Sequence, residues 1–261
     1  MAAKTNPILN KSKVMAKLTH KILVDGRITL LTGLHIGGNN MGMEVGGVNA
    51  TVIRNPVTGE PYIPGSSLKG KIRSLLDQKE GRFARLGSIE NGPDDDAGQT
   101  LVRFFGNVKG SGENIPSKVL FRDSRMIGAA LLLKKVKTFD LPFTEVKTEV
   151  VIDRVKSSAL PRSLERVPAG IEFKMSVVLN VWEDLVHAIP EEALLNLLFD
   201  GFKLLEKDYL GGKGSRGSGQ VKIGIENITK TATGDLNTRI PATLKYDPTY
   251  AAAVYGYPVP N

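Results

Sequence analysis

The segment PGSSLKGKIRSLL, residues 64–76, predicts an amphipathic helix that starts near Ser67 and ends near Lys79. Ser66 or Ser67 is expected to cap its first turn, since serine hydroxyls accept hydrogen bonds from free helical amides. The apolar residues recur three and four positions apart and therefore share one face of the helix: Leu68, Ile72, Leu75 and Leu76. This single apolar face predicts that the helix packs against the core of a folded domain.

The same helix carries Lys69, Lys71 and Arg73 with no acid between them. Free amides in the first turn of a helix bear partial positive charge, so a phosphate there would meet amides, the Ser67 hydroxyl and ammonium groups together. The alternative is a capped helix whose cations only keep its surface solvated. Taken alone, these residues favour that alternative.

Further elements are predicted on both sides of this helix. A second long helix is expected from Pro190, with glutamates in its first turn, and the block LVRFFG predicts a short helix that ends at Gly106. Alternating and β-branched residues predict four strands, at residues 21–33, 118–126, 171–182 and 220–228. The order strand, helix, strand, strand, helix, strand is that of a ferredoxin-like α+β fold, which RNA-recognition domains share.

Long segments interrupt this pattern. Residues 34–65 and 80–117 read as loop insertions, and loops of this length inside a compact domain are usually functional or disordered. Residues 134–168 are basic and poor in core residues, which predicts a protruding hairpin. One domain is therefore expected over residues 20–230, followed by a loosely attached tail over 231–261.

The segment GGKGSRGSG, residues 211–219, holds five glycines together with Lys213 and Arg216. It contains a literal G-x-G-x-x-G, but a dinucleotide site requires a strand before that motif and a helix after it. Here a helix precedes and a strand follows, which excludes that interpretation. The backbone could still approach a phosphodiester chain closely; a simple connecting turn is the equally open alternative.

The composition limits the classes of function. Lysine and arginine number 35 against 27 acids, a net charge of +8, which indicates a polyanionic partner or an inert basic surface. There is no cysteine, the three histidines are widely scattered, and no metal site is predicted. No apolar run is long enough to cross a bilayer and no signal peptide is recognised, so no membrane association and a cytoplasmic location are expected.

His35 follows the first predicted strand and lies in a loop. A loop histidine can stack on a base or bind a phosphate, although one that is satisfied by neighbouring backbone is slightly more common. Aromatic residues make up only 6% of the chain, so RNA would be held mainly by its backbone and its bases would be read little.

Taken together, five segments resemble the RAMP superfamily, and within it the family of repeating backbone subunits of type III-A (Csm) CRISPR effector complexes. They are TGLHIGG (32–38), the run from Gly46 to Leu76, LVRFFG (101–106), the run from Ile152 to Phe173 and DYLGGKGSRGSGQVKI (208–223). The resemblance implies a ferredoxin-like palm with an inserted lid and a projecting thumb over residues 134–168.

The resemblance also implies partners and site residues. Copies of such subunits stack head to tail along a CRISPR guide RNA, beside target RNA and other effector subunits. His35, Lys71 and Arg154 occupy the positions of guide contacts. A phosphate at the helix start or at the glycine segment would have further candidate contacts, which are Ser67, Lys69, Arg73, Lys213 and Arg216.

The chain departs from this family at one position. In VNATVIRN, residues 48–55, Asn49 replaces the aspartate that supports metal-dependent cutting of target RNA in the family. A carboxylate can hold Mg²⁺ or another divalent ion and help to activate a 2′-hydroxyl, whereas a neutral carboxamide is a poor ligand and no useful base. Binding without efficient cutting is therefore expected.

Two other functions compete with this interpretation. One is a stand-alone RAMP endoribonuclease that processes precursor CRISPR RNA, with His35 as general acid or base. The other is a nucleotide-dependent enzyme built around residues 211–219, which the order of the flanking elements disfavours.

Overall fold

The computed structural model describes residues 17–38, 50–81, 100–107, 115–130, 141–153, 155, 158–183, 188–234 and 240–241. The strands are β1 (Lys17–Leu30), β2 (Tyr62–Ile63), β3 (Val119–Phe121), β4 (Ser124–Met126), β5 (Glu145–Asp153), β6 (Ser158–Arg166), β7 (Glu172–Glu183), β8 (Val221–Ala232) and β9 (Ile240–Pro241). The helices are α1 (Gly65–Lys79), α2 (Thr100–Phe105), α4 (Glu191–Glu206) and the 3₁₀ turn η1 (Gly214–Arg216).

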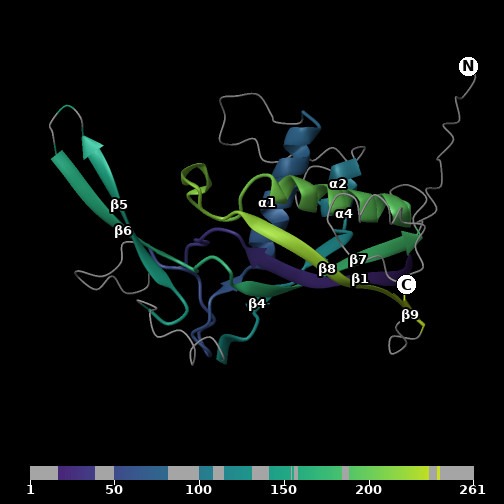
Figure 1. Ribbon diagram of the computed structural model, residues 1–261. Coiled ribbons are helices and arrows are strands. Elements are labelled where there is room, and N and C mark those ends of the chain that lie inside the picture. Colours follow the sequence, from purple (N-terminus) through teal and green to yellow (C-terminus); the bar gives the residue numbers. More distant parts are fainter. Residues whose placement is uncertain are drawn as a thin grey trace, which may run out of the picture.

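A mixed α/β architecture results, in which one antiparallel sheet carries the helices on one face (Figure 1). Its strand order is β2-β4-β7-β1-β8-β9, and β3 also pairs with β7. The central strands β1 and β7 pair along nearly their whole length, from Lys17 opposite Glu183 to Thr29 opposite Glu172. This long central ladder fixes the positions of the loops at its ends.

The core lies between the sheet and the helices. Alternate residues of β1 turn toward the helices and are buried: Ile22, Val24, Ile28 and Leu30. Gly201 of α4 faces Ile72 of α1, where a Cβ would overlap the isoleucine side chain, so the two helices approach closely at this point. Among the described residues, no helix combines the length and the apolar character needed to span a membrane.

The first helix begins differently from the prediction. Its N-cap is Pro64 and it starts at Gly65, so Ser66 and Ser67 lie inside the first turn and neither side chain caps it. Asp123 takes that role, because its Oδ1 accepts a hydrogen bond from the Gly65 amide at 2.8 Å. The predicted serine cap was wrong because the helix starts two residues earlier than expected.

Two strand boundaries also differ. The strand predicted over 118–126 is split into β3 and β4 at Arg122 and Asp123, the residue that caps α1. The final strand continues past Ile228 to Ala232, because Thr229 and Thr231 pair with β1 beyond a bulge near Asp25. The start expected for the tail therefore falls inside β8.

A separate two-stranded sheet, β5 with β6, projects away from the main sheet (Figure 1). It lies within residues 134–168, where a hairpin was predicted, and pairs Glu145 with Arg166 at its base and Asp153 with Ser158 near its tip. Val150 and Ile152 are exposed near that tip.

Candidate nucleic-acid interface

Three segments that are distant in sequence meet at one end of the main sheet. They are the loop after β1 that contains His35, the glycine loop 211–219, and the base of the β5–β6 hairpin. The Gly212 amide donates to the His35 carbonyl at 2.8 Å, and the Gly219 amide donates to the Gly33 carbonyl at 2.9 Å. Leu34 and Val167 exchange two backbone hydrogen bonds of 2.8 Å. The loop after β1 is therefore held between the other two segments.

The glycine loop is tightly folded. Lys213 has φ 63 and Gly211, Gly217 and Gly219 also have positive φ, a conformation that residues other than glycine seldom adopt. The loop folds over Tyr209, and a Cβ at Gly214 would overlap that ring. The exposed side chains of Lys213 and Arg216 are thus held on a shaped backbone instead of on a floppy turn.

Lys71 joins helix α1 to this loop. Its Nζ lies 3.1 Å from Oδ2 of Asp208 and 3.8 Å from the centroid of the Tyr209 ring. The carboxylate and the aromatic face together hold this cation in place, and the lysine side chain remains 20% exposed. Lys71 is therefore positioned next to the glycine loop, as its candidate role requires.

The other α1 cations face elsewhere. Lys69 donates to Ser117 at 3.0 Å, and Arg73 donates to the Gly106 carbonyl at 3.2 Å and lies over the Phe105 ring. Burial, and secondarily repulsion by Arg73, lower the pKa of Lys69. These two side chains hold α2 and the segment before β3 against α1, and the structure does not bring them to the glycine loop.

The start of α1 is not the open phosphate site that the sequence suggested. The Gly65 amide is occupied by Asp123, and the Ser67 amide donates to the Pro64 carbonyl at 3.0 Å. A carboxylate at a helix start repels a phosphate approaching along the same axis. The candidate interface therefore lies at the Lys71 side of α1, away from its first turn.

His35 is 8% exposed and lies at the centre of the three segments. Its Nδ1 donates to the Glu165 carbonyl at 2.7 Å, and its ring lies against Gly212. A carbonyl can only accept, so Nδ1 carries a proton in this contact. The histidine thus joins the loop after β1 to the hairpin base.

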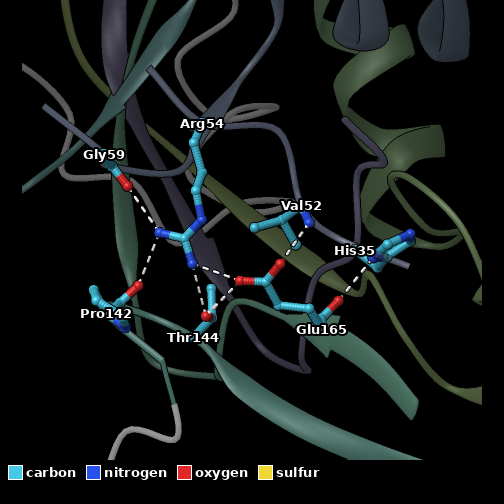
Figure 2. A network of polar contacts seen from close by, with 7 residues as sticks. All are labelled: His35, Val52, Arg54, Gly59, Pro142, Thr144 and Glu165. Carbon is cyan, nitrogen blue, oxygen red and sulfur yellow. Dashed lines mark hydrogen bonds and ion pairs between the residues drawn. The ribbon is translucent and has the colours of Figure 1, made fainter. Parts of the chain in front are cut away.

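Glu165 is the centre of a polar network at that hairpin base, which Figure 2 shows. Arg54 donates to Oε1 of Glu165 at 2.5 Å, Thr144 donates to the same oxygen at 2.7 Å, and the Val52 amide donates to Oε2 at 2.8 Å. The rest of the Arg54 guanidinium donates to the carbonyls of Gly59 and Pro142. One carboxylate thereby joins two loops to β6.

The Glu165 carboxylate is 2% exposed, yet its pKa is held below the ordinary value for glutamate. Burial opposes ionisation, but the hydrogen bonds from Thr144, Arg54 and the Val52 amide, with the charge of Arg54, outweigh it. The Glu165 amide also donates to the Ala50 carbonyl at 3.0 Å. The backbone that follows position 49 is therefore bound to the hairpin base.

Arg216 connects the glycine loop directly to the hairpin. Its guanidinium lies 3.4 Å from Oε2 of Glu149 on β5, and Lys147 lies 3.3 Å from Oε1 of the same carboxylate. Although burial opposes it, the hydrogen bond and charge of Lys147 and the charges of Arg216 and Lys213 lower the pKa of Glu149. Cations of the glycine loop and of the hairpin therefore lie on both sides of this carboxylate.

Two candidate residues, Asn49 and Arg154, lie outside the described residues. Within the described ranges, no group of three histidine, aspartate or glutamate side chains could hold a metal ion. The backbone amide of Glu165 bonds to the Ala50 carbonyl, and the carboxylate oxygens of Glu165 are already used by Arg54, Thr144 and Val52. These oxygens are therefore not available to hold a divalent ion.

Several residues of this region were not predicted from the sequence. They are the network members Arg54, Thr144 and Glu165 and the partners of the cations, Asp208, Tyr209 and Glu149. Asp208 and Tyr209 lie within three residues of the start of the glycine loop, so their closeness to it could have been predicted from the sequence. No local pattern distinguishes Glu165 from the other charged residues of its strand.

Comparisons with known proteins agree with one another. A family model described as the RAMP superfamily matches residues 27–222. The chain is 38% identical over 209 residues to a CRISPR system Cms endoribonuclease Csm3 from Methanocaldococcus jannaschii, with 79% of each chain covered. It is also 38% identical over 212 residues to the Csm3 endoribonuclease of Streptococcus thermophilus, covering 81% of this chain and 90% of that relative.

Solved structures give the same result. The chain is similar, with a TM-score of 0.52 and 27% identity, to a chain of the Csm3–Csm4 subcomplex of the type III-A CRISPR-Cas interference complex, covering 87% of this chain and 89% of the other. The fold is also similar to that of Methanopyrus kandleri Csm3, with a TM-score of 0.55, 21% identity and coverage of 92% and 87%.

Proposed function

This chain belongs to the RAMP superfamily and, within it, to the family of Csm3 proteins, and on that premise we propose that it is the CRISPR RNA-binding backbone subunit of a type III-A effector complex. The observation that carries the proposal is the convergence of His35, Lys71, Lys213 and Arg216 at one end of the sheet. The similarity to relatives named Csm3, which extends over most of their length, supports the same assignment.

The guide strand would run along the basic seam defined by Lys71, Lys213 and Arg216. Lys71 and Arg216 each rest on a carboxylate, Asp208 or Glu149, that a phosphate would replace. Lys213 makes no hydrogen bond or ion pair through its side chain among the described residues. Each cation can thus form an ion pair with a phosphate without a rearrangement of the fold.

The finer architecture belongs to this proposal. We infer a ferredoxin-like palm, because the helix-covered strands lie in the antiparallel order β4-β7-β1-β8 with a helix after the first and third strands in sequence. Residues 34–65 and 80–117 would form the lid and residues 134–168 the thumb, with β5 and β6 as its shaft. Arg154 would contact the guide from the thumb.

Copies of the chain would stack head to tail along the guide and present target RNA at regular intervals, beside other type III subunits. The family relatives are named endoribonucleases. Asn49 removes the carboxylate expected for cutting, so this chain would bind target RNA and cut it poorly.

The stand-alone processing enzyme is less well supported. A general acid or base must reach a reacting proton, but His35 is 8% exposed and its Nδ1 is already bonded to the Glu165 carbonyl. These contacts are explained directly if His35 holds the loop after β1 against the hairpin base.

The assembly can be tested with guide RNAs of increasing length. The purified chain is mixed with synthetic guides that differ by regular increments, and the copies bound are counted by native mass spectrometry. A stepwise increase in copy number with guide length is expected. One or two copies on every guide would contradict a stacking subunit and favour the processing enzyme.

A further inference from the structure

The face of the main sheet that is turned away from α1 and α4 carries a row of three side chains on adjacent strands. Tyr62 of β2 pairs with Arg125 of β4, and Arg125 pairs with Lys174 of β7. Residues that are directly opposite on paired strands point to the same side of the sheet, with their Cβ atoms about 5 Å apart. The three side chains therefore lie side by side.

Their direction follows from their neighbours in sequence. Ile63, Met126 and Phe173 are buried in the core at 0%, 8% and 0% exposure. Successive residues of a strand point to opposite faces, so Tyr62, Arg125 and Lys174 point away from the helices. Arg125 and Lys174 are exposed and Tyr62 is half-buried.

The charge of this row is unbalanced. Like charges directly opposite on neighbouring strands destabilise a sheet. The next cation in the row, Arg27 opposite Lys174, is neutralised by Glu172 and Glu226. Within the described part of the chain, the side chains of Arg125 and Lys174 make no ion pair or hydrogen bond. Repulsion between these two cations is therefore not compensated by any of the residues that the structure describes.

We propose that Tyr62, Arg125 and Lys174 form a second RNA-contact surface, which binds a single-stranded segment that does not lie on the basic seam of the guide site. An aromatic ring beside two cations on an open sheet face fits a base stacked on the ring and phosphates on the cations. An acidic peptide would use the cations but leave the ring without a planar partner. The identification of the polyanion as RNA rests on the proposed function.

The position of the row is consistent with one continuous RNA path. The row crosses β1 at Arg27, three residues before the strand ends at Leu30, a distance of roughly 10 Å along the strand. The glycine loop leads into β8 at Val221, opposite Leu30. An RNA strand that leaves the guide site therefore only has to pass the end of β1 near Leu30. It then reaches the second surface on the face of the sheet turned away from the helices.

The test compares two double variants that each remove two exposed cations, R125A/K174A and K17A/K79A. Affinity of the full-length chain for a fluorescent oligouridylate is measured as a function of salt. In the R125A/K174A variant, the negative slope of log affinity against log salt is expected to become shallower by about 1.4. In the control variant the slope is expected to stay unchanged. An unchanged slope in R125A/K174A, with binding still weakened by Lys71→Ala, would overturn the second surface alone; absence of RNA binding by every form would contradict the proposed function instead.

Ultraviolet cross-linking followed by peptide mapping gives an independent readout. A uridine adduct is expected on the peptide that contains Tyr62, retained in Tyr62→Phe and lost in Tyr62→Leu. In a guide-loaded complex with complementary RNA, the cross-linked strand identifies whether the segment comes from guide or target. The opposite result is that poly-glutamate displaces the oligouridylate and that no adduct forms at Tyr62. This result would overturn the proposal in favour of an acidic protein partner.

Discussion

At the level of single residues, Lys71 has the clearest role. Its ammonium group contacts Asp208 and the Tyr209 ring and so connects α1 to the glycine loop. Lys71→Ala should remove one phosphate contact and loosen Tyr209, so the complex should retain less guide RNA. Lys79→Ala is the matched control, because Lys79 also lies on α1 and also pairs with an aspartate, Asp200. Equal RNA content per protein in both purified variants would contradict this role.

The rate of target cutting is expected to depend on which residue stands at position 49. Asn49→Asp would place a carboxylate at the position that we propose for the family's cleavage residue, and it should raise the rate of target cutting with Mg²⁺ by about 10²–10⁴-fold. The measurement is the rate at which a labelled target is cut at regularly spaced sites. If target RNA stays equally intact with either residue, the assignment of this loop is wrong.

The sequence predicted some of these residues and not others, for a physical reason. Lys71, Lys213 and Arg216 are cations in distinctive local patterns, and the structure places them around the glycine loop. Glu165 could not be found in this way, because its partner Arg54 lies 111 residues away and its burial depends on how two loops pack. Lys69 and Arg73 look equivalent to Lys71 in the sequence, but the packing of α2 separates them.

At the level of elements, the glycine loop owes its shape to Tyr209. Gly214→Ala should force the new methyl group into that ring, reduce the free energy of unfolding by about 1–3 kcal/mol and weaken RNA binding. Gly70→Ala serves as the control, because Gly70 lies in α1 with open space around it and alanine there should stabilise the helix by about 1 kcal/mol. Chemical denaturation and RNA titration of both variants measure these effects.

The hairpin base should respond to pH through Glu165. Its pKa is lower in the folded chain than in the unfolded one, so its contribution to stability is full above the ordinary glutamate pKa and is lost as pH falls through the folded value. Glu165→Gln should cost about 3 kcal/mol near neutral pH, and this difference from the unmodified protein should shrink below about pH 4.

Denaturation across a pH series measures that difference, with the exposed Glu183→Gln as control. A cost for Glu165→Gln that stays constant down to pH 2 would show that the carboxylate charge is not what stabilises the hairpin base.

Periodicity predicted the elements themselves more reliably than their ends. The apolar stripe of α1 and the alternation in β7 were read correctly, because burial of one face imposes both patterns. The helix start and the break between β3 and β4 were not, because both depend on the hydrogen bond between Asp123 and Gly65, which joins residues 58 positions apart.

At the level of the whole molecule, the net charge of +8 should appear as a salt dependence of RNA binding. If about six phosphates are neutralised per subunit, log affinity should fall with log salt at a slope of about −4 for single-stranded RNA. Fluorescence anisotropy over a range of salt concentrations gives this slope. A slope near zero would mean that the excess of cations is incidental to binding.

The most direct test of the RNA-binding account is to extract the purified native particle with phenol and to measure the length of any RNA released. RNA of a defined length, long enough to span several copies of the chain, is the predicted result. A particle that contains no RNA, and that also fails to bind oligoribonucleotides at low ionic strength, would contradict the account.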